Sequence, residues 1–180
     1  MGKLDEALEE MILAKELDPL SLIINADIAQ ISNYARRYDQ AIEAAQKTLE
    51  LDPNYRAAYM YLGPAYLGKS NYEEALKAFE KCRILGGRYG ARIDIAMGKI
   101  YQQMGKDDHA QQRFKEFEKR TNPLLVSPYI WAMYYFTVEE NEKGFEWLNK
   151  AYERRDHLIW YLKVDQGSIM FAPIQDIWRC

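Results

Sequence analysis

Small residues recur in this chain at an interval of about 34 residues, and this interval strongly constrains the fold. Ala7, Ala41 and Ala75 lie 34 residues apart, Ala110 follows after 35, and Gly144 follows after another 34. A fixed period of this length indicates a chain built from repeated supersecondary units. A single unit of this kind cannot bury its apolar face alone, so neighbouring units must stack against one another.

A second pattern follows the same interval. Pro19 and Pro53 are each preceded by Leu-Asp and lie 34 residues apart. With small, leucine and aromatic residues at matching places, the chain resembles the tetratricopeptide repeat. The resemblance is strongest in residues 56–89, which place these types at Tyr59, Leu62, Gly63, Tyr66, Ala75 and Phe79. It implies an all-α fold, a right-handed superhelix of antiparallel helix pairs with a concave groove.

Aligned on the small residues, the sequence divides into a half repeat, four complete repeats and a C-terminal cap. The predicted ranges are 1–20 for the half repeat, 22–55, 56–89, 91–124 and 125–158 for the complete repeats, and 159–180 for the cap. Terminal repeats need a polar or capped outer face. We therefore expect Trp160, Phe171 and Trp178 to cover the end of the core.

Local signals predict where several helices begin and end. Ser21 is a predicted N-cap, and Ser127 is another, with Pro128 at the first helical position. Asp52-Pro53 should end a helix over 38–51, because a residue before proline avoids the helical region. The glycines of Gly86-Gly87-Arg88-Tyr89-Gly90 should supply positive φ for a longer turn.

The small residues should let the two helices of each repeat approach closely. Gly63 is expected to face Ala75, with bulky side chains filling the spaces between helices. Pro64 follows Gly63 in the middle of a predicted helix. It removes the hydrogen bond to the Met60 carbonyl and should bend the helix by more than about 20°. Tolerated drift within a strong repeat is an equal explanation for this proline.

Composition excludes several classes. Of the 180 residues, 48% are hydrophobic and 28% charged, which favours a packed core over disorder. A formal net charge of −3 argues against direct nucleic-acid binding, which requires a basic surface. No run of 18 apolar residues exists, so we predict no membrane association. Two cysteines give no disulfide framework, and a reducing cytoplasmic location fits best.

No pattern indicates chemistry. His109 follows Asp107-Asp108 without further ligands at a metal-binding spacing. Cys82 lies where the repeat needs a small buried residue, so it is interpreted as core and not as a nucleophile. The glycines at 86, 87 and 90 do not follow a strand and do not indicate a phosphate loop. We therefore expect no enzyme activity, no metal and no cofactor.

The last third carries a closer resemblance. Residues 126–129, 145–156 and 160–165, followed by Phe171-Ala172-Pro173-Ile174, resemble the C-terminal repeat segment of large bacterial regulators. Those proteins carry an N-terminal winged-helix domain, a Ser/Thr kinase or a nucleotide cyclase. Residues 166–170 depart from that pattern. The resemblance implies a C-terminal sensor or docking module whose effector domain would precede Met1.

The repeat family also implies which residues line the concave groove, at fixed positions of the first helix in each repeat. The implied lining residues are Ile23, Ala26, Gln30, Tyr34, Met60, Pro64, Leu67, Arg92, Ile95, Lys99, Gln102, Tyr129, Met133 and Phe136. Of the basic and amide residues that grip acidic chaperone tails, only Asn33, Arg92 and Lys99 are present. A carboxylate clamp is therefore not expected.

This groove predicts a protein–protein interaction module that binds an apolar peptide or helix. Two alternatives remain open. The groove could be covered by the chain's own C-terminal segment or by a second copy, or it could enclose a small molecule or lipid. The half repeat adds a prediction of self-association, simplest as a symmetric dimer, through an apolar stripe of Leu4, Ala7, Leu8, Met11 and Leu17.

Overall fold

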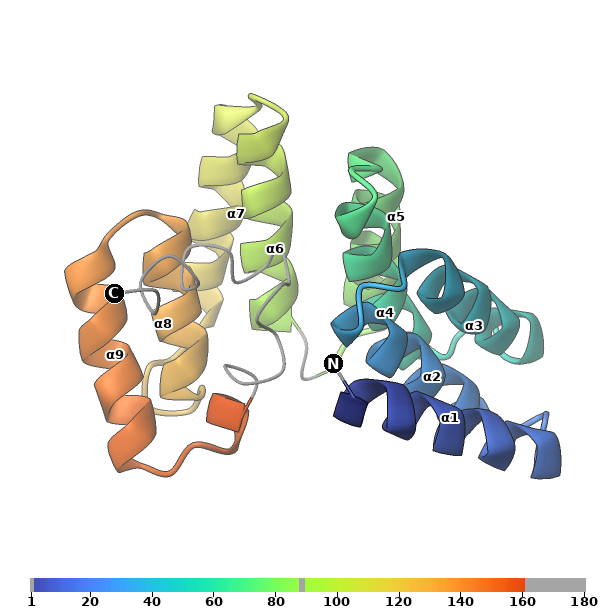
Figure 1. The fold of residues 1–180 in the computed structure, drawn as a ribbon. Coiled ribbons are helices and arrows are strands. Elements are labelled where there is room, and N and C mark those ends of the chain that lie inside the picture. Colours follow the sequence, from blue (N-terminus) through green and yellow to red (C-terminus); the bar gives the residue numbers. More distant parts are fainter. Residues whose placement is uncertain (1, 88–89, 161–180) are drawn as a thin grey trace. The chain divides into compact units, whose positions relative to one another are not determined.

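The computed structural model describes residues 2–87 and 90–160, and the regular elements in these ranges are all helical (Figure 1). The predicted all-α class is therefore confirmed for the described residues. The helices are α1 (Gly2–Leu17), α2 (Leu22–Tyr34), α3 (Tyr38–Leu51), α4 (Arg56–Gly68), α5 (Tyr72–Ile84), α6 (Gly90–Gln103), α7 (Asp107–Arg120), α8 (Pro128–Thr137), α9 (Asn141–Glu153) and the short 3₁₀ helix η1 (His157–Trp160).

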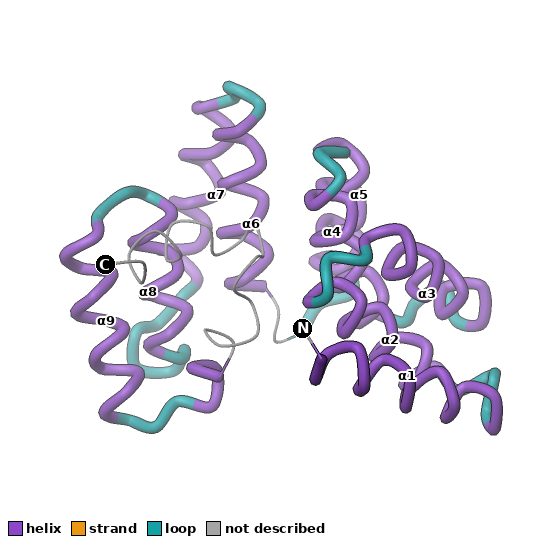
Figure 2. Tube along the Cα trace, in the orientation of Figure 1, coloured by secondary structure: helices purple, strands orange, loops and turns teal. Residues whose placement is uncertain are grey.

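The chain forms two compact units, an N-terminal unit over Met1–Gly87 and a C-terminal unit over Arg88–Cys180. In the N-terminal unit α2 packs on α3, α4 packs on α5, and α1 packs on α2. In the C-terminal unit the pairs are α6 with α7 and α8 with α9. Short loops join the helices of each pair, as Figure 2 shows. The predicted cap at 159–180 lies, from residue 161 on, outside the described residues.

One turn geometry recurs between the two helices of every pair. A residue with positive φ ends the first helix each time: Arg36 (58°), Ser70 (59°), Gly105 (68°) and Glu139 (64°). The next residue's N–H donates to a carbonyl five residues back, which is the Schellman motif that closes a helix C-terminus. These N···O distances are 2.8–2.9 Å, for Arg37 to Ser32, Asn71 to Tyr66, Lys106 to Tyr101 and Glu140 to Tyr135. The repeat interval is thus built into the turns as well as the packing.

Glycines allow close packing inside three of the helix pairs. A Cβ placed on Gly63 would lie 2.6 Å from the ring of Phe79, and one on Gly98 would lie 2.2 Å from Phe114. In the α8–α9 pair the glycine comes from the second helix, where Gly144 meets Phe136 at 2.6 Å. The predicted role of the small residues is confirmed. The sequence analysis expected Gly63 to face Ala75. The atoms nearest to a Cβ on Gly63 belong to Phe79.

The predicted helix caps are present. The Ser21 hydroxyl accepts a hydrogen bond from the Ile24 N–H at 3.4 Å, and the Ser127 hydroxyl accepts one from the Tyr129 N–H at 3.2 Å. Gly86 and Gly87 have φ of 76° and 94°, as predicted for the turn after α5. Gly90 differs, because it is the first residue of α6 and has no positive φ.

Helix α4 continues through Pro64 without interruption. A proline lacks an N–H, so the Met60 carbonyl loses the main-chain donor that a helix normally provides. The flanking turns and the packing of α4 on α3 and α5 hold the helix together despite this loss. The bend at Pro64 stays a prediction.

The N-terminal half repeat differs from the expectation in which side of α1 is exposed. Leu8 is fully buried in the core with Ile28, Ala29 and Ala45. Leu4 and Met11 are half-buried. Leu8 is therefore not available for the association that the sequence predicted, whereas Leu17 of the same stripe is exposed, as are Leu13 on α1 and Leu20 in the turn that follows.

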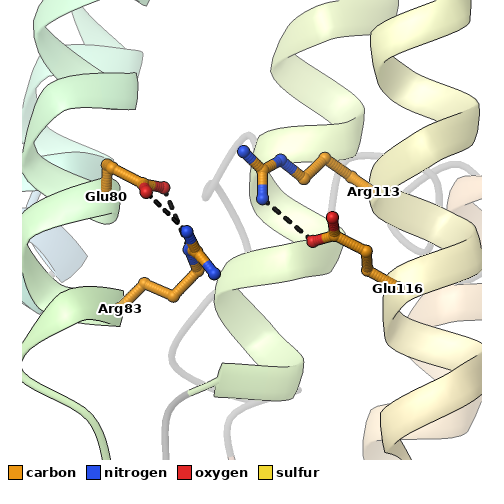
Figure 3. A network of polar contacts seen from close by, with 4 residues as sticks. All are labelled: Glu80, Arg83, Arg113 and Glu116. Atoms are coloured by element: carbon orange, nitrogen blue, oxygen red, sulfur yellow. Dashed lines mark hydrogen bonds and ion pairs between the residues drawn. The ribbon is translucent and has the colours of Figure 1, made fainter.

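Two ion pairs on the helix surfaces each lie within a single helix turn (Figure 3). On α5 the Arg83 guanidinium donates to both carboxylate oxygens of Glu80, at 2.5 and 3.0 Å. On α7 Arg113 donates to Glu116 at 3.0 Å. Pairs spaced by three residues stabilise a helix by about 0.2–0.5 kcal/mol each. They support the helices locally and do not define a site.

Candidate protein-binding surface

In the N-terminal unit the predicted groove residues lie on α2 and α4, which pack side by side. Their exposure differs. Ala26, Met60 and Leu67 are buried, whereas Ile23 is exposed. The side chains with intermediate exposure are Gln30, Tyr34 and Pro64. Together with the exposed Ile23, these three residues are the predicted groove residues of this unit that a partner could contact without unfolding the core.

Polar contacts connect this surface. The Gln30 side-chain amide donates to the Tyr34 hydroxyl at 3.0 Å within α2. The Asn33 side-chain amide donates to the main-chain carbonyl of Tyr61 on α4 at 2.7 Å. The other amide atom, Asn33 Oδ1, is buried and has no hydrogen-bond partner among the described residues. An unpaired buried acceptor is costly, and such groups in native proteins are rare.

Asp27 belongs to the same helix, and the sequence analysis did not select it. It is half-buried on α2 between the buried residues Ala26 and Ile28. Burial raises the pKa of the Asp27 carboxyl above its usual range. A single acidic residue inside an otherwise uncharged helix was the sequence signal that could have identified it.

In the C-terminal unit the predicted groove residues lie on α6 and α8. Ile95, Tyr129, Met133 and Phe136 are buried. Arg92 and Lys99 are half-buried, and Gln102 is exposed. Phe136 packs within the α8–α9 pair, because its ring lies against Gly144 and meets the Phe145 ring edge-on at 5.3 Å. These contacts give Phe136 a core role.

Lys99 has an unusual electrostatic position. Desolvation by burial lowers the pKa of its ammonium group from 10.5 to about 8. A lysine with a pKa this close to neutral pH reports an environment that disfavours positive charge. Among the predicted groove residues of this unit, Lys99 is thus the one whose ionisation is most strongly affected by burial.

Aromatic side chains dominate the contacts between α7, α8 and α9. The Phe117 ring meets Trp131 at 4.9 Å and Tyr134 at 4.6 Å, and Trp131 stacks on Trp147 at 5.6 Å. The Lys150 ammonium lies 4.3 Å from the centre of the Trp147 ring. The sequence analysis did not predict the stack of Trp131 on Trp147.

The structure also describes the surroundings of Cys82 and His109, which were considered for catalysis and metal binding. Cys82 is fully buried, and its desolvation raises the pKa of the thiol to about 11, which disfavours the reactive thiolate. The His109 ring lies 5.2 Å from the Tyr101 ring. Within residues 2–87 and 90–160, no three His, Cys, Asp or Glu side chains gather in a way that could hold a metal ion.

Among the described residues, no helix is both long enough and apolar enough to cross a bilayer.

Comparison with known proteins identifies the repeat. Residues 29–85 match the sequence model of the tetratricopeptide repeat family. The matching range contains α3, α4 and α5 completely and only the second half of α2.

Several curated proteins are similar over part of this chain. The protein bimA of Emericella nidulans is 28% identical over 113 residues, which is 62% of this chain and 14% of bimA. The small glutamine-rich tetratricopeptide repeat-containing protein 2 of Mycosarcoma maydis is 32% identical over 75 residues, 42% of this chain and 21% of that protein. The Hsp70-Hsp90 organizing protein of Triticum aestivum is 31% identical over 80 residues, 44% of this chain and 14% of that protein. The matched regions thus make up between 14% and 21% of the length of these relatives.

Solved structures of MamA share the fold. One crystal structure of MamA superimposes with a TM-score of 0.62 at 20% identity, covering 89% of this chain and 93% of MamA. A MamA fragment from Desulfovibrio magneticus RS-1 gives a TM-score of 0.60 at 18% identity, covering 67% of this chain and 70% of the fragment. At these identities the likeness shows a helical solenoid fold and nothing about binding. Residues 29–85 thus match the tetratricopeptide repeat family, and the described helices share the solenoid fold of the MamA structures.

Proposed function

We propose that this chain is a protein-interaction module that binds a peptide or helix of a partner along α2 and α4. The observation that carries the proposal is Asn33, whose side-chain oxygen is buried without a partner while its nitrogen holds the Tyr61 carbonyl. A main-chain N–H of a bound peptide would satisfy this oxygen and remove its desolvation cost.

The neighbouring side chains support a peptide as the ligand. Gln30 and Tyr34 already form a hydrogen bond with each other and can exchange it for contacts with a peptide backbone. Pro64 adds a rigid apolar surface with intermediate exposure. A combination of adaptable amide groups with aromatic and apolar surface suits peptide recognition. The acidic Asp27 next to this surface favours a peptide that carries no carboxylate at that point.

The resemblance of residues 145–156 to the end of bacterial multidomain regulators extends the proposal to the context of the protein. In that context the chain acts in the cytoplasm as the docking or sensing part of a signalling or transcription protein. The curated relatives match over small parts of their own length, so their partners are not transferred to this chain.

A random-peptide display library selected against the full chain tests the proposal. Binding of a selected peptide should weaken by about tenfold in Gln30→Ala or Tyr34→Ala, as for a contact of ordinary interface strength. Gln46→Ala and Lys47→Ala on the exposed side of α3 provide matched controls and should leave affinity unchanged. Equal losses in both pairs, or no selected peptide, would contradict the proposal.

The C-terminal unit supports a second candidate, a small-molecule or lipid sensor. Ile95, Tyr129 and Met133 are apolar or aromatic groove residues that are buried rather than open to a peptide. Their burial also means that Tyr129→Ala or Met133→Ala would disturb packing and not report binding alone. Native mass spectrometry of the purified full chain distinguishes the candidates. A retained small molecule would favour the sensor, whereas an unmodified mass would favour the peptide-binding module.

A further inference from the structure

Each unit exposes leucine side chains at one end. In the N-terminal unit Leu13 is 54% exposed, Leu17 89% and Leu20 68%, and we call these three residues the α1 surface. In the C-terminal unit Leu124 is 80% exposed and Leu125 83%, and these two form the α7–α8 loop surface. Leucines this open at a chain's surface are candidates for contact with another protein.

The α1 surface is surrounded by negative charge. Leu13 and Leu17 are one helical turn apart on α1 and therefore lie on the same face. The carboxylates within a turn of them, all exposed, belong to Glu9, Glu10, Glu16 and Asp18. Lys15 is the one basic side chain in this stretch, and it is half-buried.

The α7–α8 loop surface is surrounded by positive charge. The leucines follow the C-terminus of α7 and precede the N-cap Ser127, whose hydroxyl donates to the Asp156 carboxylate just after α9. This hydrogen bond brings the end of α9 to the same end of the unit. The exposed basic side chains at these two helix ends are Lys119, Arg120, Arg154 and Arg155. Glu118 and Glu153 are exposed carboxylates at these helix ends, and Asp156 is a third whose side chain is largely buried, so the four basic side chains outnumber the acidic ones by one.

We propose that the α1 surface of one copy of this chain docks on the α7–α8 loop surface of a second copy. The two surfaces match in apolar character and are opposite in charge, which is the complementarity that directs association and register. A symmetric contact between two α1 surfaces would place carboxylates against carboxylates, and this repulsion disfavours it. The contact is therefore head-to-tail, and a bound pair leaves one α1 surface and one loop surface free for further copies.

Sedimentation velocity of the full chain over a range of concentrations tests this association. Leu13→Glu with Leu17→Glu disables the α1 surface, and Leu124→Glu with Leu125→Glu disables the loop surface. Each double variant should weaken self-association by about tenfold or more, because the replaced leucines form the apolar centre of the contact. All four side chains are exposed, so folding should be retained, and circular dichroism checks this.

Mixing the two double variants gives the sharpest outcome. An equimolar mixture retains one intact pairing of surfaces, so it should form dimers and no larger species. Wild-type chain should form species beyond the dimer at high concentration. A symmetric dimer would instead be lost in the α1 variant alone, would persist in the loop variant, and would not be restored by mixing. That result, or a strictly monomeric wild-type chain, would overturn the proposal.

Charge provides an independent test. Glu9→Lys with Glu16→Lys should weaken association, and so should Lys119→Glu with Arg120→Glu. Mixing the two charge-reversed variants should restore association, because the mixture contains one unchanged pair of surfaces and one pair with both charges reversed, and raised salt should weaken the wild-type contact. Ile84→Glu at the end of α5 is a matched control, because Ile84 is as exposed as Leu20 but belongs to neither surface. An equal loss in this control would show non-specific hydrophobic association and overturn the proposal.

Discussion

The Asn33 side chain on α2 donates a 2.7 Å hydrogen bond to the main-chain carbonyl of Tyr61 on α4. This carbonyl follows that of Met60, which has no main-chain donor because residue 64 is proline. Asn33 thus ties the first helices of two successive repeats together at the turn of α4 that the proline weakens. The same amide carries the unpaired Oδ1 on which the proposed peptide contact depends.

Replacing Asn33 should show both roles. Asn33→Ala removes the hydrogen bond to Tyr61 and should lower the free energy of unfolding by about 1 kcal/mol in urea denaturation. Gln46→Ala is the control, because the hydrogen bond from the Gln46 amide to the Tyr66 hydroxyl is longer and exposed. This substitution should change stability by less than about 0.5 kcal/mol. In a Pro64→Ala background the cost of Asn33→Ala should become smaller. An unchanged cost there would mean that Asn33 does not compensate for the proline.

Gly63 should tolerate no larger side chain. Gly63→Ala places a Cβ 2.6 Å from the fully buried Phe79 ring and should destabilise the chain by about 1–3 kcal/mol. Gly90→Ala is the matched control, because no atom lies within 4 Å of its added Cβ and its φ is not positive. Thermal denaturation of both variants measures the difference, and equal midpoints would contradict the packing described for α4 and α5.

The repeated turn predicts opposite effects for two reciprocal substitutions. Ser70 has a φ of 59°, which is strained for a residue with a Cβ, so Ser70→Gly should stabilise the chain by about 0.5–1 kcal/mol. Gly105 occupies the same place in the next repeat with a φ of 68°, so Gly105→Ser should destabilise it by a similar amount. Chemical denaturation midpoints should therefore move in opposite directions, and a shift in the same direction would count against the shared turn.

Lys99 should make stability depend on pH in an alkaline range. Its folded-state pKa is lowered to about 8 by desolvation, so the unfolded state binds more protons than the folded state between pH 8 and 10.5. The destabilisation from Lys99 is fully present below pH 8 and is relieved as pH rises toward 10.5. Lys99→Met removes this dependence, so the stability difference between variant and wild type should shrink over that range. A constant difference in urea midpoints would show that burial does not control this ammonium group.

The sequence alone determined the repeat and most helix ends. The 34-residue interval predicted helix pairs, and the observed helix Tyr38–Leu51 begins and ends at the expected residues because Asp52-Pro53 stops it. Ser21 and Ser127 were identifiable as N-caps because capping depends on the residue itself and on its immediate neighbours. Local backbone preferences and a fixed packing period depend on the order of residues along the chain, so the sequence is enough to predict them.

The tertiary structure decided which side chains those helices bury. Phe136 was expected in the groove but packs on α9, and Leu8 was expected in an association stripe but lies in the core. The atoms nearest to a Cβ on Gly63 belong to Phe79, a contact that the sequence analysis did not select. The basic charges near Leu124 likewise gather only when the ends of α7 and α9 are brought together, whereas the carboxylates around Leu17 are its neighbours in sequence. Periodicity places a residue on a helix, whereas its exposure depends on the volume and charge of neighbours from other helices, which residue order does not specify.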